Sequence, residues 1–157
     1  MPPFSHLEWK VPYEPGTLEA KAEGVNQTAE SRLETTGAPA EVVLSPDRTT
    51  IDADGRDVSV VAVAIADDQG RTVPTANNLV QFHIDGDAKI IGVGNGQPNS
   101  LEPDKAEKRS AFNGLCMVLV QAGRNPGGIH LTASSGGLRA GDTTIITRKS
   151  EPIPELQ

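Results

Sequence analysis

The chain has 157 residues, and its 14 Lys and Arg residues against 21 Asp and Glu residues give a formal net charge of −7. Phosphate backbones and anionic lipids repel such a chain, and no dense basic stripe offsets the charge. Nucleic-acid binding and membrane adsorption are therefore disfavoured. No apolar run approaches the roughly 20 residues that span a bilayer. The first residues, MPPF, have neither the basic nor the apolar region of a signal peptide.

The first 37 residues contain three short runs typical of β-strands. In the run 7–13, Leu7, Trp9, Val11 and Tyr13 alternate with polar residues or proline, and strands are also predicted over 17–23 and 27–35. Three strands are too few to form a sandwich of their own. The segment 1–37 is therefore expected to be part of a truncated domain or to pack on the next one.

A self-sufficient series of strands follows a predicted boundary at residues 37–39. In the longest strand, 57–66, we expect Val61, Val63 and Ile65 to face the core because they bury more area than the alanines between them. Spacing and turn residues predict an all-β, immunoglobulin-like sandwich of about seven strands over 38–150, and an extended tail over 151–157. The predicted strands are 41–44, 57–66, 80–84, 88–93, 115–121, 129–133 and 143–147.

Two regions are candidates for a contact with sugar or with another domain. The segment 94–113 is long for a connection in a compact domain and rich in polar residues. Trp9 and Tyr13 are the single Trp and Tyr of the chain, and such rings stack on sugars, although packing in a core is the alternative. The candidate contact residues are Trp9, Tyr13, Asn95, Gln97, Asn99, Glu102 and Asn113.

The sequence predicts no metal site and no cofactor. His6, His83 and His130 lie on different predicted strands, whereas a zinc site needs three or four converging ligands. The acidic segment 52–57 differs from a calcium-binding EF-hand loop, because Gly55 comes at its fourth position and no Glu at its twelfth. We interpret this segment as a β-turn in which Gly55 has a positive φ angle.

The sequence also contains no pattern of catalytic residues. A nucleophile elbow, G-x-S-x-G, is absent. Most Asp and Glu residues fall in turns or on outward strand positions, whereas a glycosidase needs two carboxyl groups facing across a cleft. Cys116 lies within an apolar strand and is expected to be a buried small residue, not a nucleophile.

Several strings in order resemble the C-terminal immunoglobulin-like region of bacterial glycoside hydrolase family 2 enzymes of the β-galactosidase type. The string WKVPYEPGTLEA (9–20) resembles the closing strands of one domain, and GAPA (37–40) with LSPDRTTIDADGRD (44–57) resembles the start of the next. The pattern continues with VPTANNLVQF (73–82), GVGNGQP (92–98) and AFNG (111–114). The resemblance spans residues 9–146.

This resemblance implies a non-catalytic accessory domain of a larger, exported enzyme, with the catalytic glutamates in a barrel outside this chain. Residues 1–37 would then be the closing strands of a preceding immunoglobulin-like domain. The partners would be the barrel and other domains of the same polypeptide, and the compartment would be periplasmic or extracellular. A carbohydrate-binding module remains an alternative. A second alternative is an adhesin-type spacer repeat, because the turns at 53–55 and 67–70 resemble those of invasin-type adhesins.

Overall fold

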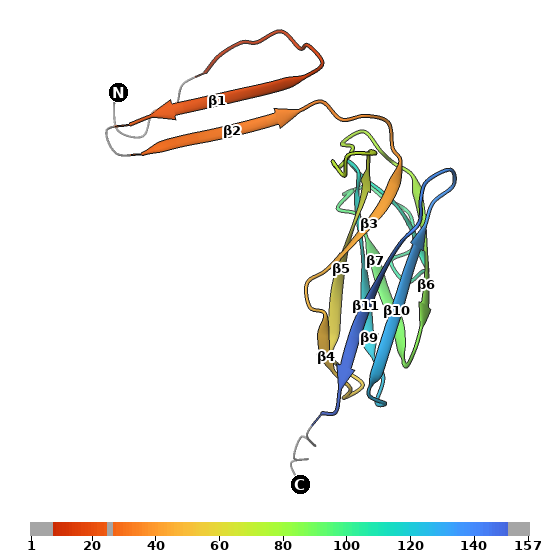
Figure 1. Ribbon diagram of the computed structural model, residues 1–157. Coiled ribbons are helices and arrows are strands. Elements are labelled where there is room, and N and C mark those ends of the chain that lie inside the picture. Colours follow the sequence, from red (N-terminus) through yellow and green to blue (C-terminus); the bar gives the residue numbers. More distant parts are fainter. Residues whose placement is uncertain (1–7, 25–26, 151–157) are drawn as a thin grey trace. The chain divides into compact units, whose positions relative to one another are not determined.

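The computed structural model describes residues 8–24 and 27–150, and the predicted tail 151–157 lies outside the described residues (Figure 1). Eleven strands lie in the described part of the chain. The chain divides into two compact units, with the first ending at Thr35 and the second beginning at Thr36.

The first unit contains an antiparallel hairpin of β1 (Thr17–Glu23) and β2 (Thr28–Glu34), at the positions that the sequence predicts. Its register opposes Leu18 to Leu33, so these apolar side chains share one face while charged residues occupy the other. Both leucines are exposed, at 51% and 68%. A hairpin of two strands has too small an apolar face to be stable without a partner surface.

The strand predicted over 7–13 is wrong for its described residues. Residues 8–14 have no regular secondary structure, and Leu7 lies outside the described range. Pro12 lacks a backbone N–H, and Pro15 ends the run. The segment therefore has few backbone N–H groups that could pair with a neighbouring strand. An alternating apolar pattern alone does not form a strand when no neighbouring strand pairs with it.

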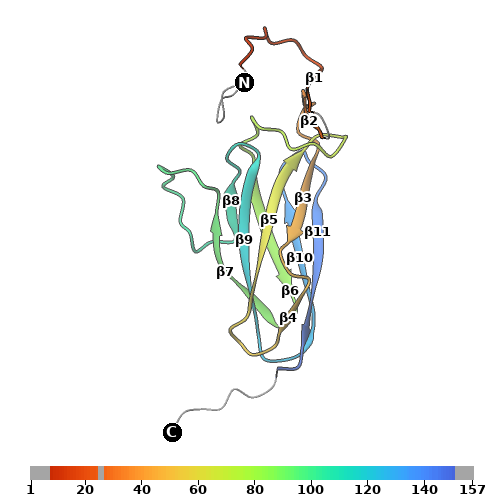
Figure 2. The same ribbon diagram turned by 90° about the vertical axis from the view of Figure 1, so that its left-hand side faces the viewer.

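The second unit is a β-sandwich of two sheets, which confirms the predicted fold class (Figures 1 and 2). The five-stranded sheet has the order β4 (Thr50–Asp52), β11 (Gly141–Arg148), β10 (Gly127–Ser134), β6 (Leu79–Asp85) and β8 (Lys108–Ser110). The four-stranded sheet has the order β3 (Glu41–Pro46), β5 (Val58–Ala66), β9 (Leu115–Ala122) and β7 (Ala88–Gly94). All pairings in the two sheets are antiparallel except β4 with β11.

The core lies between the two sheets and is built from alternate residues of the long strands. Val61, Val63 and Ile65 of β5 are at most 1% exposed, as the sequence predicts. The opposing sheet contributes fully buried residues from its two central strands, and complete burial of such side chains stabilises the fold by about 1.5–3 kcal/mol each. These residues are Ile129, Leu131 and Ile145.

Strands β4 and β8 are absent from the sequence prediction, which gave seven strands to this unit. Each has three residues, which is too short to show an alternating pattern. Strand β8 lies within the segment 94–113 that was predicted to be a loop, so the connection from β7 to β8 covers 95–107 (Figure 2). In the described part of the chain, no helix has the length and hydropathy required of a membrane span.

Candidate functional site

Asn95, the first candidate in the long connection, is an internal anchor. Its side chain is 8% exposed and donates from Nδ2 to the Ser110 carbonyl at 2.9 Å. Its Oδ1 accepts from Arg109 Nη2 at 3.0 Å and from the Gln97 backbone N–H at 3.1 Å. Three partners satisfy the amide, so Asn95 holds the connection to β8 and has little capacity left for a ligand.

Arg109 organises this connection, although the sequence did not single it out. It lies on β8 with its side chain 5% exposed, and Nη1 donates to the Glu102 carbonyl at 3.1 Å and to Asp104 Oδ1 at 3.0 Å. Its Nε has no hydrogen-bond partner among the described residues and lies 3.6 Å from Glu102 Oε2. The three polar residues Lys108, Arg109 and Ser110 show no alternation in sequence, and Arg109 faces inward because β8 pairs with β6.

Glu102 is bound within the same network. Its carboxylate accepts from Ser110 Oγ at 2.9 Å and lies 3.3 Å from the Ser110 backbone nitrogen. We define the Arg109 network as Asn95, Glu102, Asp104, Arg109 and Ser110. It brings together two of the residues predicted as contacts, Asn95 and Glu102, through their bonds to Arg109 and Ser110.

The remaining loop candidates are not members of the Arg109 network, although the Gln97 backbone N–H donates to Asn95. Gln97 Nε2 donates to Asn99 Oδ1 at 3.4 Å, with Asn99 exposed. Asn113 has a φ angle of 53° and Gly114 one of 79°, so they form the two-residue turn before β9. The turn closes through a bond of 2.8 Å from the Phe112 N–H to the Leu115 carbonyl. Turn geometry therefore accounts for Asn113.

The aromatic candidates in the first unit are exposed. Trp9 is 68% exposed and Tyr13 is 78% exposed, with Val11 between them at 60%. Their rings are accessible to a flat apolar ligand or to a protein surface. The segment that carries them has no regular structure, so no sheet fixes their mutual orientation.

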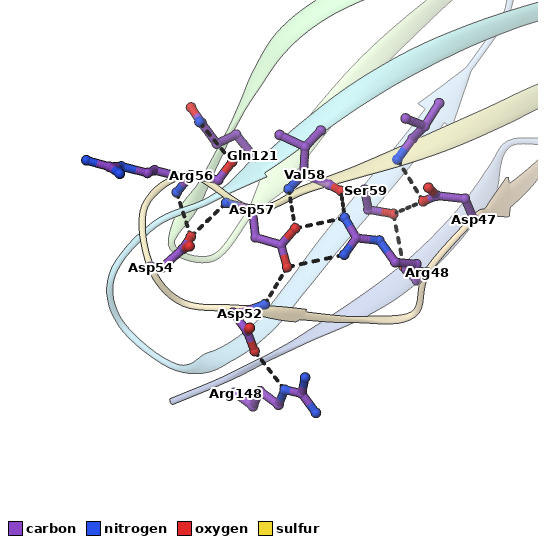
Figure 3. Close-up of polar contacts among 11 residues, drawn as sticks. Asp47, Arg48, Asp52, Asp54, Arg56, Asp57, Val58, Ser59, Gln121 and Arg148 are labelled. Carbon is purple, nitrogen blue, oxygen red and sulfur yellow. Dashed lines mark hydrogen bonds and ion pairs between the residues drawn. The ribbon is translucent and has the colours of Figure 1, made fainter. Parts of the chain in front are cut away.

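The acidic segment near 52–57 forms a network with its own backbone (Figure 3). Asp54 Oδ1 accepts from the N–H groups of Arg56 and Asp57, each at 2.7 Å, and Gly55 has a φ angle of 77°. Asp57 accepts from the Asp52 N–H at 2.9 Å and forms an ion pair of 2.8 Å with Arg48. This geometry is that of the predicted β-turn.

The pKa values of these carboxyls are shifted in the direction opposite to that of a general acid. Burial opposes ionisation of Asp57, but the Asp52 N–H and the Arg48 guanidinium outweigh it and lower the pKa. The N–H groups of Asp57 and Arg56 likewise lower the pKa of Asp54. A glycosidase acid requires a raised pKa near neutral pH. These carboxylates are therefore suited to hold turns.

The surroundings of Glu30 and Cys116 shift the pKa values of their side chains. Among the described carboxyls, the pKa of Glu30 is raised, because its carboxyl hydrogen-bonds to that of Glu19 on the exposed face of the hairpin. Cys116 is buried, and burial raises the pKa of its thiol to about 12, as expected for a small core residue. In the described part of the chain, no three His, Cys, Asp or Glu residues converge to hold a metal ion.

Comparison with known sequences confirms the resemblance to glycoside hydrolases. The chain is 46% identical over 135 residues to the β-galactosidase BoGH2A of Bacteroides ovatus, covering 85% of this chain and 16% of that protein. It is 33% identical over 124 residues to a β-galactosidase of Thermoanaerobacter pseudethanolicus, covering 79% of this chain and 15% of that protein. The chain thus spans about one sixth of the length of these curated relatives.

Solved structures share the fold. A glycosyl hydrolase family 2 member from Bacteroides cellulosilyticus matches with a TM-score of 0.87 and 37% identity, over 90% of this chain and 18% of that chain. A β-glycosidase from Bacteroides vulgatus gives a TM-score of 0.83 and 29% identity, over 88% of this chain and 18% of that chain. The D00–D0 domain of intimin gives a TM-score of 0.51 at 16% identity, and shows a likeness of fold alone.

The family model described as glycoside hydrolase family 2 C-terminal domain 5 matches residues 42–144. The match covers most of the sandwich, from the second residue of β3 into β11. The chain therefore belongs to the glycoside hydrolase family 2 C-terminal domain 5 family.

Proposed function

We propose that this chain is a non-catalytic accessory domain of a longer family 2 glycoside hydrolase of the β-galactosidase type. The relatives, of which it spans about one sixth, support this by their names and family. The observation that carries the proposal is that the acidic side chains hold the fold together. Asp54, Asp57 and Glu102 all accept hydrogen bonds from neighbouring groups of the sandwich, and none is placed as a free acid or nucleophile.

In this role the sandwich supports the rest of the polypeptide mechanically. The hairpin of β1 and β2 fits the same role, because its exposed Leu18 and Leu33 need a partner surface. We infer that this hairpin completes a neighbouring domain of the longer protein. Export of that protein remains a prediction from the resemblance, to be tested by cell fractionation.

The proposal is tested by deleting residues 36–150 from the longer polypeptide. The thermal midpoint should fall by at least a few degrees, because an interface of the sandwich is lost. The molecules that stay folded should retain turnover of a chromogenic β-galactoside. Complete loss of kcat with an unchanged midpoint would contradict the proposal, since it would place a catalytic group within the deleted domain.

A second candidate function, carbohydrate binding, is favoured by one observation. Trp9 and Tyr13 present exposed rings, at 68% and 78%, and exposed rings stack on the apolar faces of sugars. Isothermal titration of the chain with galactose-containing oligosaccharides and plant polysaccharides tests it. Saturable heat that disappears in Trp9→Ala would establish binding at this segment. An absence of heat at millimolar ligand would exclude it.

A further inference from the structure

The two central strands of the four-stranded sheet are apolar on both of their faces. In β5, Val61 and Val63 face the core, while Val60 and Ala62 point to the other side and are exposed. Strand β9 repeats the pattern, with Val118 buried and its neighbours on the outer side apolar as well. We define the β5–β9 outer face as Val60, Ala62, Ala64, Leu115, Met117 and Leu119.

The strand register assembles these residues into a continuous surface. Ala64 pairs with Leu115, Ala62 with Met117, and Val60 with Leu119, so the six side chains form three adjacent rows. Within the three rows the flanking strands add small or apolar residues, whereas Glu41 on β3 and Lys89 on β7 are charged residues on the same side beyond the rows. Strand β3 contributes Val43 and Ser45, and β7 contributes Gly92 and Gly94.

Gly92 and Gly94 have no side chains, so nothing projects from β7 at these two positions of the surface. A Cβ atom at Gly94 would lie 3.4 Å from the terminal methyl of Met117, and one at Gly92 would lie 3.7 Å from Leu119 Cδ1. These are ordinary van der Waals distances, so the side chains of Met117 and Leu119 extend to the β7 backbone, and the Asp104 carbonyl oxygen, 3.6 Å from a Cβ at Gly92, borders the surface there. Figure 2 shows the four strands of this sheet side by side. The result is a broad apolar surface.

The outer face of the five-stranded sheet is mainly polar, although Leu79 and Ile146 are exposed on it. At corresponding positions it carries imidazole, carboxylate, amide and hydroxyl groups that interact with water. The register places these groups beside one another across β6, β10 and β11. They are Gln81, His83, Asp85, His130, Thr132 and Thr144.

This contrast indicates that the β5–β9 outer face is covered in the complete protein. An antiparallel strand with one face in water alternates apolar and polar residues, whereas strands that are apolar on both faces are typical of sheets covered on both sides. Large exposed apolar patches on soluble proteins mark interaction sites. Leu115 and Met117 remain 49% and 40% exposed in this chain, so the patch is available to a partner.

The chemistry of the face selects among possible partners. The six residues include no aromatic ring for stacking and no polar side chain for hydroxyl groups, so the face does not suit a sugar. Two copies of the chain each carry a net charge of −7, which opposes their association. A domain on the same polypeptide is not a second copy with the same charge, and covalent linkage gives it an effective concentration of about millimolar order.

We propose that the β5–β9 outer face docks onto an apolar surface of another domain of the same polypeptide. This inference rests on the proposed accessory function and adds the surface through which it acts. The chain matches 16% of a curated relative and 18% of a solved one, so in those proteins most of the polypeptide lies outside the matched part. The other sheet, with its polar outer face, stays in contact with water.

Thiol labelling of two matched variants tests the docking. Met117→Cys places a thiol in the β5–β9 outer face, and Ile146→Cys places one on the outer face of the other sheet, where Ile146 is 49% exposed against 40% for Met117. The native Cys116 is buried and has a raised pKa of about 12, so it reacts slowly and serves as the blank. Circular dichroism verifies that each variant is folded.

In the isolated chain both thiols should react with a maleimide at similar rates. In the longer polypeptide we expect Met117→Cys to react about 100-fold more slowly, as for a group that reacts through rare opening, and Ile146→Cys to keep its rate. Val60→Cys repeats the test on β5. Equal labelling rates of Met117→Cys and Ile146→Cys in the longer polypeptide would overturn the docking. Labelling of Met117→Cys in the isolated chain that slows as the protein concentration rises would also overturn it, because it would show that a second copy covers the face.

Failure of the docking and failure of the accessory function give different results. Turnover of substrate by the isolated chain would contradict the accessory function and leave the labelling rates unaffected. Rapid labelling of Met117→Cys in the longer polypeptide would contradict the docking while the isolated chain remained inactive.

Discussion

Two glycines in turns have nearly the same backbone conformation but different surroundings. Gly114 has a φ angle of 79° and Gly137 one of 77°, which side chains rarely adopt. A Cβ atom at Gly114 would overlap the Val73 carbonyl oxygen, whereas one at Gly137 would point into open space. The backbone conformation should therefore cost an alanine the same free energy at both sites. Any difference in the free energy of unfolding between the two alanine variants then measures the close packing around Gly114.

We expect Gly137→Ala to lower the free energy of unfolding by about 1 kcal/mol, the cost of the left-handed conformation. Gly114→Ala should cost at least about 2 kcal/mol more, because the backbone at Val73 must shift. Urea titration of both variants provides the comparison. Equal losses would show that the Gly114 turn is not tightly packed against residue 73.

Asp67 is the fully buried carboxylate of the sandwich and links its turn to the preceding segment. It accepts from the backbone N–H groups of Gly37 at 2.8 Å and Gln69 at 3.0 Å, and it pairs with Arg71 at 2.8 Å. Burial opposes ionisation, but these donors outweigh it and lower the pKa well below its ordinary value of 3.8.

Since the folded-state pKa of Asp67 is lowered, its stabilising contribution is complete above the ordinary value of 3.8 and is lost as the pH falls below it. We expect Asp67→Asn to be less stable than the parent at neutral pH and to lose less stability between about pH 5 and about pH 2. Denaturation at a series of pH values measures this. Asp68→Asn, an exposed neighbour, is the control, and equal pH slopes for Asp67→Asn and the parent would contradict the assignment.

At the scale of elements, the connection 95–107 depends on Arg109 for its order. Its guanidinium joins Asn95, Glu102 and Asp104 from three places along the connection. Removing Arg109 leaves the buried amide of Asn95 without one of its partners, whereas the Asp104 side chain, 84% exposed, stays hydrated. We expect Arg109→Ala to cost about 1–3 kcal/mol, and to speed hydrogen exchange over residues 95–107.

Lys108→Ala is the matched control for Arg109→Ala, because Lys108 is the adjacent residue on β8 and is exposed. It should change the free energy of unfolding by less than about 0.5 kcal/mol. Unchanged exchange over 95–107 in Arg109→Ala would show that other contacts hold the connection.

The long strands were predictable because each has enough residues to show its alternation. Strands β1, β5, β6, β7 and β9 lie within one or two residues of the predicted ranges. The three-residue strands β4 and β8 have no such signal and depend on neighbours distant in sequence. The strand predicted at 7–13 failed for the opposite reason, because its alternation has no pairing partner in the described residues.

At the scale of the whole molecule, the fold class follows from periodicity, but the functional surfaces do not. Asn95 and Glu102 were predicted as contacts because polar residues in long loops are often exposed, yet both interact with buried Arg109. The β5–β9 outer face joins residues that are distant in sequence, such as Val60 and Leu119, so its continuity appears only in the register. Its available signal was the apolar character of both faces of 60–66.

The measurement that tests the central claim most directly is hydrolysis by the purified 157-residue chain. The chain would be assayed at high concentration with chromogenic β-galactoside and β-glucuronide substrates across the pH range. An accessory domain whose carboxylates hold its turns should give the rate of the buffer alone. Saturable turnover that disappears on substitution of a carboxylate, for example in Asp57→Asn, would contradict the account and place an active site within this chain.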